Sequence, residues 1–478
     1  MVNFGLINEW EPAPGRLTSW VASLASIAEA GHAPAHPIPP SHQQEEYLRT
    51  AARNEDAGFR FSRLCLVAFD FAAPLDKAAM TQAINDFLRR HDTFHSWFSA
   101  EGDGAIARHV VDPSIFDFVP TDHGDKDGPD DIRLHVEAET PGPFHWDCFT
   151  FGAVEHGDGF TFYAALDHLV TDGISSALIV VELLQLYAMA AYGAENTLSE
   201  VGSYIDYCER ERSGSAELTL DSPHVKRWIE LVQAHGGGLP TFPLGLGVSS
   251  DGYARTAHRS TSLFDEDHAE GFATVCRENN ASFVAGVLAV AALASYEFTG
   301  RQKYFGLTPK STRSTPAEFN SIGWFTSLIP VPLEIDESSA FSAIVGDSQL
   351  SFDAGKELTD VSFHRVLQLV EPGSGVDVPL GWSVPMVSYI DVRKLPGVDV
   401  FDALNAGLFG NRGSSEEVFL WINRFAEETT ISLLYPGTDE ARESIKLYVD
   451  RLIEIFTTIA VHGDYKPSLE AAGSHSRW

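Results

Sequence analysis

A single histidine lies where a buried strand is predicted to give way to a helix. His168 follows the apolar run 161–166, and the apolar spacing of residues 174–190 predicts a helix directly after it. A neutral imidazole accepts a proton near neutral pH and can donate it again, because its ordinary pKa is about 6.5. The placement indicates a general base at a strand end. A histidine beside an apolar run is also common as an ordinary core residue, and both interpretations stay open at this point.

Three neighbours of His168 bear on its chemistry. Asp167 precedes it, and Asp172 and Gly173 lie at the predicted helix start. A carboxylate at a helix start is usually a cap or an ion-pair partner, although Asp172 is also placed to orient the imidazole. If its charge is buried it needs a cationic partner, for which Arg313 is the candidate. Gly173 is expected to let backbone segments approach closely.

Other catalytic chemistries find little support in the sequence. There is no HExxH and no His/Cys cluster at ligand spacing, so neither a metal site nor a resident cofactor is expected. There is no GxSxG motif, and Gly346-Asp347-Ser348 falls inside a predicted helix. Base catalysis without a covalent intermediate remains, in which His168 takes the proton from a hydroxyl or amine as it attacks an activated acyl group such as a thioester.

The order of predicted helices and strands indicates an α/β (α+β) fold. A chain of 478 residues exceeds the size at which one core stops growing, about 250 to 300 residues, so two lobes are expected. Residues 1–215 are expected to form the first lobe, which contains the segment from His168 to Gly173, and residues 216–478 are expected to form the second. The glycine- and proline-rich stretch 236–243 marks the crossing between them.

Charge and composition exclude several classes of partner. The net charge of −34 makes attraction to nucleic acid or anionic headgroups unfavourable. Four widely spaced cysteines fit reduced thiols rather than a disulfide framework or a zinc ribbon. The N-terminal residues carry no export signal, and the apolar stretch 281–298 is predicted to be a core helix rather than a transmembrane segment.

Several segments together resemble a known superfamily. His168 to Gly173 reads HxxxDG and is similar to the HHxxxDG signature of the condensation-domain and chloramphenicol-acetyltransferase-like enzymes, with Asp167 in place of the first histidine. Within it the chain resembles the polyketide-associated (Pap) acyltransferases, especially the branch that acylates trehalose or sulfated trehalose. The further segments that carry the resemblance are 39–44, 88–98, 146–149, 306–313, 323–330 and 387–391.

The resemblance implies an architecture and roles for individual residues. Two similar chloramphenicol-acetyltransferase-like lobes would enclose an active-site tunnel at their interface, with His168 as the base. Asp172 would form a structural ion pair with Arg313, and Asp167 and Gly173 would belong to the active-site loop. Asp167 would support that loop, and as a second carboxylate it is expected to raise the pKa of His168. The segment Trp324-Phe325-Thr326 would line the tunnel, while its two aromatic residues are equally expected as packing residues.

The resemblance also implies a reaction. The expected enzyme is an O-acyltransferase that moves a long-chain fatty or polyketide acyl group from acyl-CoA or a carrier protein to a hydroxyl of trehalose or a trehalose-derived glycolipid. A free-standing condensation enzyme that forms another ester or an amide is one alternative, and a catalytically silent protein that docks a carrier protein is another. A polyketide synthase is a further partner, and a cytoplasmic monomer at the inner face of the membrane is expected.

Overall fold

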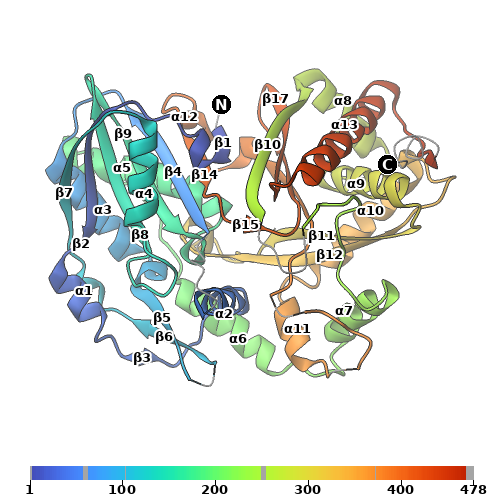
Figure 1. The fold of residues 1–478 in the computed structure, drawn as a ribbon, viewed down its shortest axis with the longest axis horizontal. Coiled ribbons are helices and arrows are strands. Elements are labelled where there is room, and N and C mark those ends of the chain that lie inside the picture. The colour runs from blue at the N-terminus through green and yellow to red at the C-terminus, as the bar shows by residue number, and fades with distance from the viewer. Residues whose placement is uncertain are drawn as a thin grey trace. The chain divides into compact units, whose positions relative to one another are not determined.

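The computed structural model describes residues 3–56, 63–102, 104–248, 254–371, 373–379 and 381–469 (Figure 1). The chain divides into two compact units that are discontinuous in sequence. The first comprises Met1–Ala216, Arg313–Thr326 and Lys394–Gly413, and the second comprises Glu217–Thr312, Ser327–Arg393 and Ser414–Trp478. The sequence predicted one continuous lobe over residues 216–478, whereas two segments of that range, Arg313–Thr326 and Lys394–Gly413, belong to the first unit.

A seven-stranded mixed sheet forms the centre of the first unit (Figure 1). Its strands in spatial order are β1 (Asn3–Leu6), β14 (Gly407–Gly410), β4 (Leu64–Phe71), β9 (Gly159–Asp167), β8 (Phe149–His156), β2 (Gly15–Ala22) and β7 (Phe118–Lys126). Only the β1–β14 pair is parallel among these described strands. The apolar runs predicted as buried strands fall on β4 and β9, which pair with each other.

Alternating side chains of β9 serve two separate cores, as expected for a strand with period two. Tyr163 and Ala165 join the cluster that includes Ile132 of α4 (Pro129–Glu139). Phe162 packs on Phe69 at a ring-centroid distance of 5.3 Å. Helices α3 (Lys77–Arg90) and α5 (Gly173–Tyr192) contact each other and this sheet. A strand covered on both faces is apolar throughout, which explains the unbroken run before His168.

Smaller elements complete the first unit. A three-stranded sheet has the order β3 (Ala35–His36), β6 (Ile106–Val110) and β5 (Ser96–Ala100). The remaining α-helices are α1 (Leu24–Ala30), α2 (His42–Asp56), α6 (Tyr204–Ala216) and α12 (Val398–Phe401).

Helix α5 is apolar around most of its circumference. By length and composition it is the one helix of the described residues that passes a membrane-span test, with a mean hydropathy of 1.8 and 56% of the tested window buried. Helices α8 (Glu266–Glu278) and α9 (Phe283–Thr299) pass only as a joined pair, and they are bent by 92° at the break between them. An all-apolar helix packed on a sheet is the expected form of a core helix.

The second unit is built on a five-stranded sheet of order β13 (Met386–Asp391), β16 (Phe419–Arg424), β17 (Glu428–Pro436), β10 (Ala254–Asp265) and β15 (Ser414–Ser415). The hairpin predicted over residues 418–435 is β16–β17. Helices α8 (Glu266–Glu278), α9 (Phe283–Thr299) and α13 (Asp439–His462) share one apolar cluster with this sheet. The predicted small-residue helix and the predicted final amphipathic helix are α9 and α13.

Strands β11 (Lys303–Ser311), which follows α9 in the chain, and β12 (Thr326–Glu334), which precedes α10, form a two-stranded sheet. The other helices of the second unit are α7 (Pro223–Ala234), α10 (Phe341–Lys356) and α11 (Phe363–Leu369). Gly346-Asp347-Ser348 lies inside α10, and the Ser348 hydroxyl donates to the carbonyl of Ala285 at 2.7 Å. Ser348 is therefore a packing residue rather than a nucleophile on a sharp turn.

Candidate active site

Hydrogen bonds from neighbouring strands fix the backbone of His168. Strand β9 ends at Asp167, and a 3-10 turn covers His168–Val170. The His168 backbone N–H donates to the carbonyl of Arg63 at 2.7 Å, and the Asp167 N–H donates to the carbonyl of Cys148 at 2.8 Å. The histidine is thus held at the end of a central strand, where its position depends on the sheet rather than on a loop.

Asp167 closes the turn that carries His168. Its side chain is fully buried and accepts the backbone N–H of Leu169 at 2.9 Å. From the other side, the amide of Gln44 in α2 donates to the Leu169 carbonyl at 2.9 Å. The carboxylate at position 167 therefore caps a turn, and it is placed to support the loop.

The imidazole of His168 is in a poorly hydrated environment. Its ring lies 4.3 Å from the ring of Trp324, and its Nδ1 is buried without a hydrogen-bond partner among the described residues. Burial, followed by the positive charge of Arg63, lowers the pKa of His168 to about 4, against which the charge of Asp172 acts weakly. The expectation that a second carboxylate raises this pKa is wrong, because burial dominates. The ring is neutral at pH 7, as a general base must be.

A buried ion pair lies behind the histidine. Arg313 Nη1 donates to Asp172 Oδ2 at 2.7 Å, and Arg313 Nη2 donates to Oδ1 at 3.1 Å. The two side chains are 0% and 5% exposed, respectively. Asp172 Oδ1 also accepts the N–H of Ser175 at 2.8 Å, which caps α5, and Oδ2 accepts the N–H of Phe325 at 3.0 Å. Both carboxylate oxygens are thus fully engaged, so Asp172 does not contact the His168 ring through a hydrogen bond.

Arg313 ties together the loop that follows β11. Its Nε donates to the carbonyl of Glu318 at 3.1 Å, and its Nη2 donates to the carbonyl of Ser321 at 3.1 Å. The guanidinium also lies over the Phe325 ring, 4.4 Å from its centroid. The planar guanidinium therefore donates at once to Asp172 and Ser175 at the start of α5 and to two carbonyls of the 318–321 turn. The compact ammonium group of a lysine could not make this set of contacts.

Ser175 is a residue of this network that the sequence analysis missed. Its hydroxyl accepts from Arg313 Nη2 at 2.8 Å and from the Gly323 N–H at 3.1 Å, and it donates to the Gly323 carbonyl at 2.9 Å. Its position three residues after Asp172, in the first turn of a helix, was a usable signal. A serine in the first turn of a helix is usually exposed or acts as a helix cap. The role of Ser175 therefore becomes visible only from its contacts with Arg313 and Gly323 in the folded structure.

The three residues expected to line a tunnel lie in the first unit beside this network. Trp324 is buried between His168 and Tyr47, whose ring lies 5.5 Å away in an edge-on arrangement. Phe325 is fully buried against Arg313 and Tyr204. Thr326 is half-buried at the start of β12. Within this unit the two aromatic side chains pack around His168 and the Asp172–Arg313 ion pair.

The close backbone approach expected at Gly173 occurs at another glycine. A Cβ at position 173 would meet no heavy atom of the described residues within 4 Å, so that expectation is wrong. At Gly323 a Cβ would overlap the Tyr204 ring and come within 2.9 Å of Phe325 Cε2. Glycine is therefore required where the 323–325 segment passes the buried aromatic rings, and space remains open beside Gly173.

A second buried histidine supports the same segment. His91 is 1% exposed; its Nδ1 accepts the N–H of Ile322 at 3.3 Å, and its Nε2 lies 3.0 Å from a carboxylate oxygen of Glu182. With both ring nitrogens occupied, His91 is not available as a second base. Among the described residues no group of His, Cys, Asp and Glu has metal-binding geometry.

Several known proteins resemble this chain in sequence. The condensation-domain family model matches residues 61–373. The 2'-acyl-2-O-sulfo-trehalose (hydroxy)phthioceranyltransferase PapA1 of Mycobacterium tuberculosis is 38% identical over 467 residues, which cover 97% of this chain and 89% of PapA1. The trehalose-2-sulfate acyltransferase PapA2 of Mycobacterium bovis is 35% identical, with 96% of this chain and 98% of PapA2 covered.

Solved structures extend the comparison to the fold. The structure of a PapA2 acyl transferase superposes with a TM-score of 0.90 at 34% identity, covering 96% of this chain and 100% of that chain. The first condensation domain of the calcium-dependent antibiotic synthetase superposes with a TM-score of 0.66 at 16% identity, covering 90% and 98%. The second similarity is one of fold alone.

Proposed function

Because the chain belongs to the condensation-domain family, and within it to the Pap acyltransferases, we propose that it transfers a long-chain acyl group from a thioester to a hydroxyl of trehalose, of sulfated trehalose or of a trehalose-derived glycolipid. The observation that carries the proposal is the neutral His168 at the end of β9, held in the HxxxDG sequence with Asp172 fixed behind it. The acceptor class is inferred from the names of the relatives, and the type of reaction is inferred from the chemistry of His168 as a base.

In the proposed reaction, His168 acts as a general base in a single nucleophilic attack on the thioester. His168 takes the proton of the sugar hydroxyl as its oxygen attacks the thioester carbonyl, which forms a tetrahedral intermediate. The new C–O bond is retained, the C–S bond breaks, and the imidazolium returns its proton to the departing thiolate. A positioned base of this kind contributes about 10² to 10⁴ in rate, and the alignment of donor and acceptor contributes further.

The lowered pKa of His168 keeps the imidazole unprotonated at neutral pH, weakens it as a base, and favours return of the proton in the second half of the cycle. A base with a pKa of about 4 is unprotonated at neutral pH, so no fraction of the enzyme is lost to the protonated form. The same burial makes the imidazolium an unfavourable, short-lived state that readily gives its proton to the leaving thiolate. In this mechanism Asp172 and Arg313 hold the loop, Asp167 closes the turn, and the space next to Gly173 stays open.

The remaining parts of the proposal concern architecture and partners. We infer two similar chloramphenicol-acetyltransferase-like lobes with a tunnel at their interface, along which donor and acceptor approach His168 from opposite faces and Trp324, Phe325 and Thr326 form part of the wall. Acyl-CoA or an acyl carrier protein is the donor, and a polyketide synthase is a candidate supplier. We further propose a monomer that works in the cytoplasm at the inner face of the membrane, where lipid products are delivered.

The reaction is tested by release of coenzyme A thiol from palmitoyl-coenzyme A, with trehalose, trehalose 2-sulfate or no acceptor, and with mass spectrometry of the products. Wild type and His168→Ala are compared with His224→Ala, which removes an exposed histidine of α7. Acceptor-dependent release with an acyl-sugar mass, lost in His168→Ala and retained in His224→Ala, is expected. Turnover that survives His168→Ala contradicts the mechanism.

Two alternatives predict other outcomes of the same assay. An amide-forming condensation enzyme would release thiol with an amine acceptor and not with either sugar. A silent docking protein would release none with any acceptor or donor, including an acyl carrier protein. The retained His168, Asp172, Gly173 and Arg313 favour an active enzyme, since a docking role requires none of them.

A further inference from the structure

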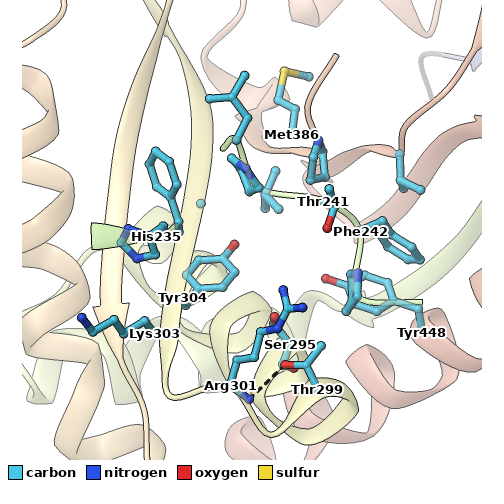
Figure 2. A pocket seen from close by; sticks show the side chains of 18 of the residues that line it. His235, Thr241, Phe242, Ser295, Thr299, Arg301, Lys303, Tyr304, Met386 and Tyr448 are labelled. Carbon is cyan, nitrogen blue, oxygen red and sulfur yellow. Dashed lines mark hydrogen bonds between the residues drawn. The ribbon is translucent and has the colours of Figure 1, made fainter. Parts of the chain in front are cut away.

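The second unit contains a cavity of about 760 Å³ (Figure 2). It lies between the C-terminal end of α9, the start of β11, the 239–243 segment and β13, and none of its lining residues belongs to the site around His168. A volume of this size accommodates a small organic molecule. The proposed transfer reaction assigns no role to any residue of this cavity.

The charge of the cavity is opposite to that of the chain. The protein has 67 acidic residues against 33 basic ones, yet the lining includes Arg301 and Lys303 and no aspartate or glutamate. Neither cation forms an ion pair with a described residue. The nearby carboxylates are otherwise engaged, because Glu417 accepts the backbone N–H of Phe242 at 3.3 Å and Glu297 accepts the hydroxyl of Tyr465 at 2.7 Å.

Hydroxyl groups converge on the same space as the Arg301 guanidinium. Figure 2 shows Tyr304, Tyr448 and Arg301 pointing toward one another across the cavity. Tyr448 is only 5% exposed, and neither phenol hydroxyl has a hydrogen-bond partner among the described residues. Burial raises the pKa of both phenols, so they stay protonated at neutral pH and available as donors. Both phenol hydroxyls are therefore free to donate to a ligand that enters the cavity.

The cavity also has an apolar wall that includes Leu420 and Phe242, and the Phe242 ring packs on Tyr448 at a centroid distance of 4.8 Å. A guanidinium flanked by hydroxyl donors recognises oxyanions, because charge-assisted hydrogen bonds are about twice as strong as neutral ones. We propose that this cavity binds the oxyanion of an organic sulfate or phosphate ester, with Arg301 as the counter-charge, Tyr304 and Tyr448 as donors, and the apolar wall against the organic body of the ligand.

If the proposed function holds, two of its substrates are candidate ligands with this chemistry. The acyl donor coenzyme A carries phosphate esters, and a sulfated trehalose acceptor carries a sulfate ester. The test measures binding rather than turnover, so it does not depend on the reaction. Calorimetric titrations with coenzyme A, trehalose 2-sulfate and unsulfated trehalose are made at constant ionic strength, with sodium sulfate replacing chloride in a competition series.

Arg301→Ala is expected to weaken binding of an ester ligand about tenfold to a hundredfold, since hydrogen bonds to charged groups contribute about 1.5 to 3 kcal/mol and 1.4 kcal/mol is a factor of ten. Tyr448→Phe removes one donor and should weaken binding severalfold. Lys446→Ala, on the same helix as Tyr448 but outside the cavity, is the matched control and should change binding less than twofold. Sulfate should compete, and unsulfated trehalose should not respond to Arg301→Ala.

The ligand that loses affinity identifies the source of the oxyanion. A loss with coenzyme A alone assigns the cavity to the donor, and a loss with trehalose 2-sulfate alone assigns it to the acceptor. Wild type that binds neither ester, or Arg301→Ala that binds both within twofold of wild type, overturns the inference. Wild type that binds an ester through Arg301 but transfers no acyl group overturns the proposed function and leaves the cavity assignment intact.

Discussion

Removal of the Arg313 side chain should destabilise the first unit more than any single surface change. In Arg313→Ala the Asp172 carboxylate keeps the N–H groups of Ser175 and Phe325 but loses both guanidinium contacts in a site that is 5% exposed. An unpaired buried charge left in this way costs about 3 to 5 kcal/mol. The loss also leaves the carbonyls of Glu318 and Ser321 without their donor, so the upper part of that range is expected.

Hydrogen exchange with peptide resolution measures this loss within one unit. A chain with two units need not unfold in one transition, whereas exchange of amides in β9 and α5 reports the opening of the first unit directly. A loss of 3 kcal/mol or more should accelerate exchange in these peptides about a hundredfold or more. Peptides from α13 should be unaffected. Arg53→Ala removes the partly exposed pair with Glu46 in the same unit and should leave exchange unchanged.

A double variant separates the charge from the lost contacts. Asp172→Asn keeps a good N-cap for α5 and removes the buried charge, so Arg313→Ala combined with Asp172→Asn should recover much of the protection that Arg313→Ala alone loses. The reasoning is refuted if Arg313→Ala exchanges no faster than Arg53→Ala, or if the double variant is as unprotected as the single one.

Three further predictions concern the base and the loop beside it. The kcat/KM of wild type should stay level from pH 8 to about pH 5 and fall at lower pH with an apparent pKa of about 4. A fall centred near pH 6.5 would contradict the lowered pKa of His168. The imidazole of His168 takes up a proton near pH 6.5 in the unfolded chain and only near pH 4 in the folded chain. As the pH falls from 6.5 to 4, the free energy of unfolding of wild type should therefore decrease relative to that of His168→Ala, as measured by denaturant titration. Gly323→Ala should destabilise the first unit through overlap with the Tyr204 ring, whereas Gly173→Ala should leave hydrogen exchange at the wild-type rate. Equal exchange rates in the two variants would contradict this difference in crowding.

Local patterns in the sequence predicted the elements that hold the base. The apolar runs of β4 and β9 are strands because they are covered on both faces, and the helical spacing after Gly173 became α5. The small-residue stretch and the final amphipathic segment likewise became α9 and α13. These features depend on residues near one another in the chain, which is why periodicity and caps reveal them.

Arg313 and Ser175 illustrate the limit of such patterns. Arg313 entered the prediction through a motif resemblance, and nothing local in its segment indicates that one guanidinium joins Asp172, Ser175 and two backbone carbonyls. The assignment of Gly173 failed for the same reason, because crowding depends on what packs against a glycine, and the crowded glycine is Gly323.

By itself, the sequence predicted His168 as the base, and it determined where the preceding strand ends and which family the chain resembles. Only the tertiary structure decided the protonation state of that base and the location of the oxyanion cavity. The physical reason is that a pKa depends on desolvation and on charges brought close by folding. A carboxylate adjacent in sequence suggested a raised pKa for His168, whereas burial and Arg63 lower it to about 4. The cavity around Arg301 depends equally on long-range packing, since Tyr304 and Tyr448 meet there from segments far apart in the chain.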